Sequence, residues 1–190
     1  GALERGTDFI YICYDNEGYM NTGTQRSSAS PVGAVTTTTP ILAKLQQKKN
    51  MIGIVEAHGI PYIATASPSY PLDLFDKVRT AKDIRGSRYI EVHAPCPPGW
   101  GFPNKDLVGM GRLAVDCGIH VLFEIKEGRF RLTSRSMEIA RKGRKSTVAD
   151  YVKGQARFKK ISAEHLEQLQ EMTDKRWEHY LERHEKTGGD

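Results

Sequence analysis

The sequence contains few cysteines and no long apolar run. Its cysteines are Cys13, Cys96 and Cys117, which are too few and too scattered for a disulfide framework. An odd number of cysteines, with no signal-peptide pattern in Gly1–Asp8, is typical of a reducing cytosol. No apolar run approaches the roughly 18 residues of a membrane span. We therefore expect a cytoplasmic chain without disulfide bonds or a membrane partner.

Neither a low-complexity composition nor a strong overall charge is present. Hydrophobic residues make up 38% of the 190 residues, charged residues make up 27%, and the formal net charge is +5. These values are close to those of ordinary globular domains, so a wholly disordered chain and a collagen-like chain are excluded. A chain of this length can bury a sizeable core as one domain or one domain with an extension.

The positive charge is concentrated between residues 126 and 160. The basic residues there are Lys126, Arg129, Arg131, Arg135, Arg141, Lys142, Arg144, Lys145, Lys153, Arg157, Lys159 and Lys160. Glu127, Glu138 and Asp150 are the acidic residues that oppose them. The segment lacks the interleaved aromatics and the zinc-ligand spacing of nucleic-acid-binding modules. A solvated face, or a docking surface for an acidic protein partner, explains the charge better, so no nucleic-acid partner is expected.

Apolar runs of strand length alternate with helical periodicities in the first part of the chain. The pattern predicts strands over residues 9–14, 62–66 and 89–93, and helices over residues 52–58, 71–84 and 106–117. This alternation predicts an α/β fold whose parallel sheet is covered by helices on both faces. In such sheets ligands bind in the loops that follow the carboxyl ends of the strands. Residues 15–40, after a strand expected to be buried, and residues 94–104 form those loops.

A different pattern begins after Gly118. Short strands over residues 120–125 and 129–133 are expected to pair as a hairpin, and a basic linker over residues 141–145 leads to helices over 147–158 and 162–186. One apolar face of the last helix is marked by Leu166, Leu169, Thr173, Trp177, Tyr180 and Leu181. We therefore divide the chain into an α/β domain over residues 1–137 and a basic linker with a helical extension over residues 138–190.

The loop over residues 15–23 concentrates side-chain oxygens and backbone carbonyls after the first strand. Hard oxygen ligands of this kind suit magnesium, which often bridges a protein loop to phosphate groups. The same residue types also form turns in which Asp15 and Asn16 bind only their own backbone. From the residues alone both interpretations stay open. The histidines (His58, His93, His120, His165, His179 and His184) have no metal-ligand spacing, and we interpret them as structural or surface groups.

Four segments of the chain resemble one enzyme family. They are residues 15–28 (DNEGYMNTGTQRSS), 33–40 (GAVTTTTP), 57–67 (AHGIPYIATAS) and 94–100 (APCPPGW), in that order. The first resembles the thiamine-diphosphate loop of 2-oxoacid:ferredoxin oxidoreductases, and the set is most similar to the beta subunit of the pyruvate:ferredoxin type. The resemblance implies a thiamine-diphosphate-binding fold. It also implies oxidative decarboxylation of pyruvate with coenzyme A, with electrons passing through iron–sulfur clusters to ferredoxin.

The resemblance also implies roles for individual residues of the loop. Asn16 falls where the amide oxygen of a magnesium ligand is expected, and Gly18 where a backbone carbonyl completes the metal shell. Asn21 falls at the catalytic position that faces the thiazolium ring and the substrate carbonyl. Asp15 and Thr22 fall at supporting positions of the cofactor-binding loop.

The same resemblance gives Cys96 a role that its surroundings do not suggest. A lone cysteine between prolines is usually a packed thiol, but in the family this position supplies one thiolate of a [4Fe-4S] cluster. Cys13 and Cys117 have no such match and are expected in the core. The family's other three cluster cysteines and its Gly-Asp-Gly motif lie upstream of the matching segments and are absent from this sequence.

These absences imply the C-terminal part of a beta subunit, which alone binds neither the thiamine cofactor nor the cluster well. The implied partners are the alpha, gamma and delta types of subunit, ferredoxin, the 2-oxoacid and coenzyme A, and the glutamate that activates thiamine comes from a partner subunit. Two alternatives stay open. The substrate could be another 2-oxoacid, such as oxalate, phenylglyoxylate or a branched-chain acid. The isolated chain could also be a non-catalytic assembly module.

Overall fold

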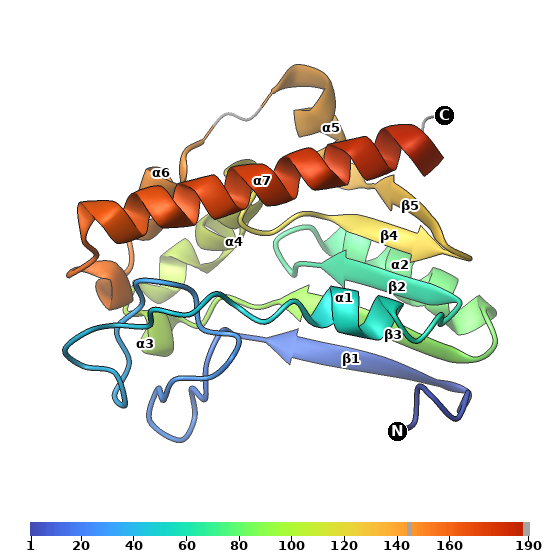
Figure 1. The fold of residues 1–190 in the computed structure, drawn as a ribbon, viewed down its shortest axis with the longest axis horizontal. Helices are drawn as coiled ribbons and strands as arrows, with labels where there is room; N and C mark the ends of the chain where they lie inside the picture. The colour runs from blue at the N-terminus through green and yellow to red at the C-terminus, as the bar shows by residue number, and fades with distance from the viewer. Residues whose placement is uncertain (144–145, 188–190) are drawn as a thin grey trace.

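The computed structural model describes residues 1–143 and 146–187 (Figure 1). The strands are β1 (Phe9–Asp15), β2 (Tyr62–Ala66), β3 (Ser87–His93), β4 (Phe123–Lys126) and β5 (Arg129–Leu132). The helices are α1 (Met51–Glu56), α2 (Pro71–Asp83), α3 (Pro97–Trp100), α4 (Leu107–Asp116), α5 (Ser134–Lys142), α6 (Val148–Lys153) and α7 (Ala163–Thr187), with 3-10 turns at Asn104–Asp106 and Ala156–Phe158.

The five strands form one sheet in the order β1-β3-β2-β4-β5. The first three strands in this order are parallel, and β3 pairs with both of its neighbours, with Tyr89 opposite Tyr11 on one side and Ile63 on the other. The hairpin β4–β5 joins the same sheet antiparallel to β2. The predicted α/β fold is therefore confirmed, and its hairpin extends the sheet rather than standing beside it.

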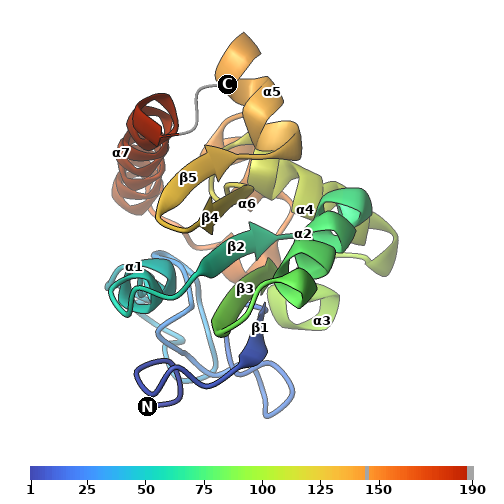
Figure 2. The ribbon, with the colours of Figure 1, turned by 90° about the vertical axis from the view of Figure 1, so that its right-hand side faces the viewer.

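Helices cover both faces of this sheet. Viewed along the sheet, α1 and α7 lie on one face and α2 on the other (Figure 2). Leu169, Thr173 and Trp177 of α7 are buried, which confirms the predicted apolar face of that helix. Trp177 packs into the same core cluster as Ile63 of β2 and Ile139 of α5. Burial of this apolar stripe, rather than helix propensity, holds α7 in place.

Strand β1 lies at an open edge of the sheet, since it pairs with β3 alone among the described residues. Tyr11, Ile12 and Tyr14 are each more than half exposed, and Cys13 is only half-buried. The expectation that this strand is buried is therefore wrong, and Cys13, which was expected in the core, packs against the core cluster but stays partly exposed. A short apolar run has the same sequence pattern in an edge strand and in a central strand, so only the strand pairing in the structure distinguishes the two.

The C-terminal part differs from its prediction in two places. Arg141 and Lys142 do not belong to a linker but end α5, where positive side chains interact favourably with the negative end of the helix dipole. Arg144 and Lys145, the rest of that expected linker, lie outside the described residues. The single helix expected over residues 147–158 is interrupted at Gly154, which follows α6, and a 3-10 turn comes next. Glycine is a poor helix former, which explains the break.

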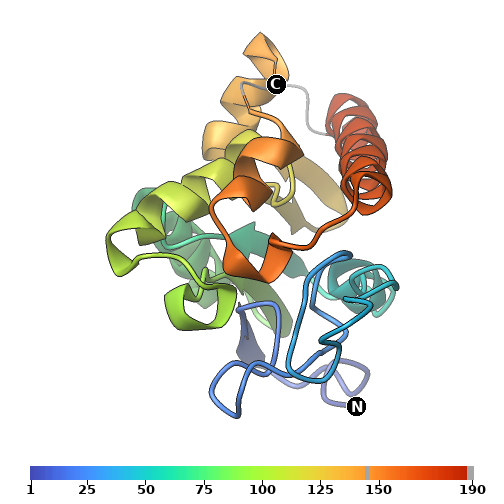
Figure 3. The same ribbon diagram turned by 90° about the vertical axis from the view of Figure 1, so that its left-hand side faces the viewer.

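The carboxyl ends of the parallel strands face one end of the molecule (Figure 3). The long loop after β1, helix α3, helix α6 and the 3-10 turn at 156–158 gather there. The loop extends to residue 50, beyond the expected residue 40, because the next helix begins at Met51. Among the described residues no helix is long and apolar enough to cross a membrane.

Candidate functional site

The two loops singled out in the sequence meet at the end of the sheet. The Ala94 N–H donates to the Asp15 carbonyl over 2.8 Å, which extends the pairing of β1 and β3 into both loops. The indole N–H of Trp100 donates to the carbonyl of Asn16 over 2.8 Å. The side chain of Met20 fills the space beside Gly99, where a Cβ would collide with its sulfur. The expectation that both loops follow the carboxyl ends of parallel strands is confirmed.

The first three residues of the loop form a buried turn. One carboxylate oxygen of Asp15 accepts a hydrogen bond from the Glu17 N–H over 2.9 Å, and the other pairs with the Lys48 ammonium. This is the Asx turn that the sequence allowed. Both carboxylate oxygens of Asp15 thus make contacts within the protein, and these contacts hold the first residues of the loop in place.

Glu17 is the centre of the charged cluster in this turn. It is 4% exposed, and its carboxylate lies 2.7 Å from the Arg157 guanidinium and 3.3 Å from the Lys48 ammonium. The Nε2 atom of His93 lies 3.5 Å from the same carboxylate. The backbone φ angle of Glu17 is 65°, in the left-handed region that residues other than glycine rarely adopt. Such backbone strain persists only where the surroundings impose it.

Opposite charges decide the protonation of this cluster. Burial alone raises the pKa of Glu17, but the positive charges of Lys48 and Arg157 outweigh it and hold that pKa well below its usual value. Burial likewise lowers the pKa of Lys48, and the charges of Glu17 and Asp15 reverse that effect and raise it above its usual value. Both groups are therefore ionised at neutral pH, as a paired buried carboxylate and ammonium should be.

The tip of the loop differs from this base. Tyr19 and Gln25 exchange backbone hydrogen bonds of 3.1 and 3.2 Å and so close a small turn. Asn21 and Thr22 lie exposed at its apex. The backbone carbonyl of Thr22 accepts a hydrogen bond of 2.6 Å from the Gln25 side chain, whereas no hydrogen bond from the described residues reaches the Asn21 amide. The tip thus presents Asn21 without burying it.

Asn16 carries a side-chain amide oxygen of the kind that could bind magnesium. Its backbone carbonyl is used by Trp100, but no hydrogen bond from the described residues reaches its half-buried side-chain amide. A free amide oxygen at a strand end is a hard ligand of the kind magnesium takes. The described residues contain no group of three acidic, histidine or cysteine side chains that could hold a metal ion, so oxygens from a diphosphate, water or other groups would complete the shell.

Cys96 lies beside this loop, at the N-terminal end of α3. It is half-buried and packs in the same cluster as Met20, next to Gly99, where an added Cβ would lie 3.2 Å from its sulfur. Cys117 is buried at the end of α4, as expected of a core thiol. A [4Fe-4S] cluster requires about four thiolates, so the cysteines described here do not by themselves fit one.

Two histidines lie at the same end of the sheet, although their spacing along the chain does not indicate it. His93 ends β3, and its ring stacks on that of His120 with 4.8 Å between centroids. Neither ring nitrogen of His93 makes a hydrogen bond to the described residues. Burial holds the pKa of His120 well below its usual value, and its Nε2 lies 3.0 Å from the Ala66 carbonyl. His120 is therefore a neutral packing group.

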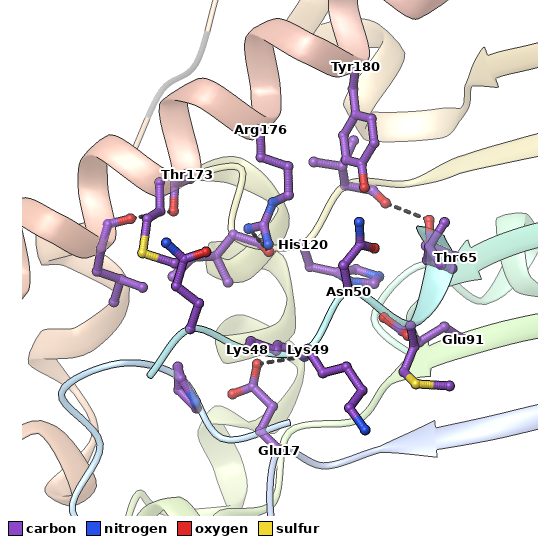
Figure 4. A pocket seen from close by; sticks show the side chains of 18 of the residues that line it. Glu17, Lys48, Lys49, Asn50, Thr65, Glu91, His120, Thr173, Arg176 and Tyr180 are labelled. Carbon is purple, nitrogen blue, oxygen red and sulfur yellow. Dashed lines mark hydrogen bonds and ion pairs between the residues drawn. The ribbon is translucent and has the colours of Figure 1, made fainter. Parts of the chain in front are cut away.

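A cavity of about 370 Å³ lies between the base of the loop, the sheet and α7 (Figure 4). Its polar lining includes Glu17 and Lys48 from the loop, Glu91 from β3 and Arg176 from α7. Burial raises the pKa of Glu91, and the nearby charge of Lys48 only partly opposes it. A second hollow of about 330 Å³ lies beside α3, where Thr24, Trp100 and Arg157 are among the lining residues.

Sequence reasoning missed Lys48, Trp100 and Arg157 as parts of this site. Arg157 was included in a basic segment interpreted as a solvated face, and for this residue that interpretation is wrong, because it is 7% exposed. Its pairing with Glu17 spans 140 residues of sequence, and no local spacing indicates such a contact. The proposed roles of Asn16, Gly18, Asn21 and Cys96 stay predictions.

Comparisons with known proteins agree with the resemblance seen in the loops. The family described as "Thiamine pyrophosphate enzyme, C-terminal TPP binding domain" matches residues 1–92. Pyruvate synthase subunit PorB of Methanothermobacter marburgensis is 48% identical over 92% of this chain and 60% of its own length. Ketoisovalerate oxidoreductase subunit VorB of Pyrococcus horikoshii is 42% identical over 94% of this chain and 57% of its own length.

The match to relatives covers nearly all of this chain but only part of theirs. The chain spans about three fifths of the length of the curated relatives it matches. Pyruvate synthase subunit PorB of Thermotoga maritima is 40% identical over 95% of this chain and 57% of its own length. Over nearly its whole length the chain is similar to PorB subunits of pyruvate synthase and VorB subunits of ketoisovalerate oxidoreductase.

Proposed function

We propose that this chain is the thiamine-diphosphate-binding part of the beta subunit of an oxidoreductase that decarboxylates a 2-oxoacid. Pyruvate is the proposed substrate, coenzyme A the acyl acceptor, and ferredoxin the electron acceptor, reached through iron–sulfur clusters. The complete enzyme requires further subunits of the alpha, gamma and delta types. We also propose that it acts in the cytoplasm.

One observation carries this proposal. The loop over residues 15–23 leaves the carboxyl end of a parallel strand with a rigid, charged base and an exposed tip. Ligand sites of α/β sheets lie at this position. The match of residues 1–92 to a thiamine-pyrophosphate-binding domain supports the assignment of the loop to that cofactor.

The loop residues divide the work of binding and catalysis. Asn16 and the backbone carbonyl of Gly18 would hold magnesium, which in turn binds the diphosphate, while Asp15 and Thr22 keep the loop in shape. Bound thiamine diphosphate supplies the carbanion-stabilising chemistry. The Asn21 amide would donate a hydrogen bond to the substrate oxygen on which negative charge develops. Donors so placed typically contribute about 3–4 kcal/mol to a transition state.

Cys96 would provide one thiolate of a [4Fe-4S] cluster close to the loop. Cys96 lies half-buried beside Met20 of the loop, and other cysteines must complete the cluster.

A second substrate is favoured by the comparisons themselves. VorB subunits of ketoisovalerate oxidoreductase are 42–43% identical to this chain, which lies within the 39–48% of the PorB subunits. A branched-chain 2-oxoacid is therefore the alternative to pyruvate.

The test is a ferredoxin-reduction assay on the assembled oxidoreductase, depleted of thiamine diphosphate and then resupplied. We expect reduction with pyruvate and coenzyme A that disappears without thiamine diphosphate and returns on its addition. Faster reduction with 3-methyl-2-oxobutanoate would transfer the assignment to the branched-chain alternative. Ferredoxin reduction at the same rate with and without thiamine diphosphate would overturn the proposal.

A further inference from the structure

The 3-10 turn over residues 156–158 is docked firmly onto the loop end of the sheet. The Val35 N–H donates to the Arg157 carbonyl over 2.8 Å, and the Ala156 N–H donates to the Gly101 carbonyl over 3.1 Å. Gly101 has a φ of 72°, and a side chain there would collide with Ala156. These backbone hydrogen bonds fix the position of the Arg157 backbone, and they do so without any contribution from the charge of its guanidinium group.

From that position the Arg157 guanidinium touches the loop in two ways. Its NH2 group pairs with the Glu17 carboxylate over 2.7 Å. Its Cζ lies 3.8 Å from the centre of the Trp100 ring, and the N–H of that ring donates to the Asn16 carbonyl. A single side chain therefore holds two consecutive loop residues, one directly and the other through Trp100.

Further contacts leave the guanidinium little freedom. The Nε group donates to the Gln155 side chain over 2.7 Å, and NH2 also lies 3.2 Å from the Tyr151 hydroxyl. Arginine suits this role because its planar group can stack on an aromatic ring and hydrogen-bond at its edge at the same time. Lysine could replace the charge but not the stacking.

Stability alone does not explain such a buried pair. Removing two charges from water costs about as much as their attraction returns, so an apolar pair of the same size is often equally stable. A buried ion pair does, however, select one geometry, because any other arrangement leaves a charge unpaired. Here the geometry selected includes the strained left-handed φ of Glu17, and Glu17 lies between Asn16 and Gly18.

We propose that Arg157 is a positioning residue: it holds Glu17 and Trp100 so that the oxygens of Asn16 and Gly18 are set for the metal–diphosphate group before the cofactor arrives. This inference rests on the proposed function of the loop. Residues that orient metal ligands without touching the metal typically change metal affinity about 10–100-fold when they are removed. Preorganisation of this kind also lowers the entropic cost of binding.

The test compares Arg157→Met and Arg157→Lys with a matched arginine elsewhere. Arg183 of α7 also forms an ion pair, half-buried, in which its Nη1 group lies 3.0 Å from Glu56 of α1, but it lies away from the loop. Hydrogen–deuterium exchange over residues 14–26 is measured on the cofactor-free assembled enzyme. Magnesium dependence of thiamine diphosphate binding is then measured by calorimetry on the same variants.

Both Arg157 variants should accelerate exchange over residues 14–26 and weaken magnesium-dependent binding about ten-fold or more. Arg183→Met should accelerate exchange in α1 and α7 and leave the binding unchanged. Unchanged exchange in the loop, or faster exchange with unchanged binding, would overturn the inference. Full rescue by lysine would also overturn it, because the stacking would then be irrelevant. Failure of the proposed function is seen separately, as parent enzyme that binds no thiamine diphosphate.

Discussion

The base and the tip of one loop are built in opposite ways. At the base, Glu17 is buried and paired with two cations; at the tip, Asn21 is exposed and no described residue binds its amide. The base satisfies its charges within the protein, so folding fixes it. The tip leaves its donor free, so a bound group can take it. A cofactor loop needs both properties, because a ligand can be held only by atoms that the protein itself leaves unused.

The largest effect on activity is expected from substitution of Cys96, which packs in the same cluster as Met20, a loop residue between the base and the tip. Cys96→Ser in the assembled enzyme should abolish ferredoxin reduction and lower the iron content, while thiamine diphosphate still binds. Iron and sulfide analysis with a ferredoxin-reduction assay measures this. Cys117→Ser, at a buried core position, is the control and should affect stability only. Normal electron transfer with full iron content in Cys96→Ser would remove the cluster role.

Removal of the central charge of the base should cost stability. Glu17→Ala leaves Lys48 and Arg157 without their shared partner, and breaking a buried pair in this way costs about 3–5 kcal/mol. Urea unfolding of the assembled enzyme measures the loss. Glu138→Ala, which removes an exposed partner of Arg135, should cost less than about 1 kcal/mol. Equal losses in the two variants would show that the base is not stabilised by its charges.

At the tip the effect should fall on the rate and not on stability. Asn21→Ala should reduce turnover about 10²–10³-fold, the usual loss for one donor to a developing negative charge. Thiamine diphosphate affinity and the urea midpoint should stay as in the parent, since the amide is exposed and makes no hydrogen bond to a described residue. Steady-state kinetics and calorimetry separate these effects. If the variant turns over at the parental rate, the catalytic role of Asn21 is wrong.

Acid should destabilise the base more than the tip. Because the pKa of Glu17 is held well below its usual value, its contribution to stability is fully present above about pH 4.5. That contribution is lost as the pH falls through the lowered folded-state pKa. Glu17→Gln should therefore flatten the acid side of a stability–pH profile. A profile that keeps the parental acid slope would contradict the predicted pKa shift.

The smallest effect is expected at Glu91, the buried glutamate of the neighbouring cavity. Burial raises its pKa in the folded protein above the usual value for glutamate. Stability is therefore lost as the pH rises from that usual pKa through the raised folded-state pKa, because the charged form is disfavoured in the folded protein. Glu91→Gln should slightly increase stability at pH 7, opposite to Glu17→Gln. Thermal unfolding of both variants at pH 7 checks the sign. Loss of stability in Glu91→Gln would mean that a positive charge stabilises the Glu91 carboxylate by more than burial destabilises it.

The strands and helices of the α/β part could be predicted because their signals are local. Tyr62–Ala66 and Gly59, with its φ of 64°, show how an apolar run and a glycine stop mark elements without tertiary information. The open edge at β1 could not be predicted, since its residues read like those of a central strand. The tip of the site could be predicted only by resemblance. At its base, the Asx turn of Asp15 could be expected from the residue types, but the pairing of Glu17 with Arg157 could not, because it spans 140 residues.

The central claim, that this loop holds thiamine diphosphate through magnesium, is tested most directly at Asn16. Calorimetric titration of thiamine diphosphate into the assembled enzyme, with and without magnesium, should show binding weakened about ten-fold or more in Asn16→Ala. Asn50→Ala is the matched control, because the Asn50 side chain caps α1 and its loss should cost only about 1 kcal/mol of stability. Magnesium-dependent affinity in Asn16→Ala equal to that of the parent and of Asn50→Ala would contradict the account.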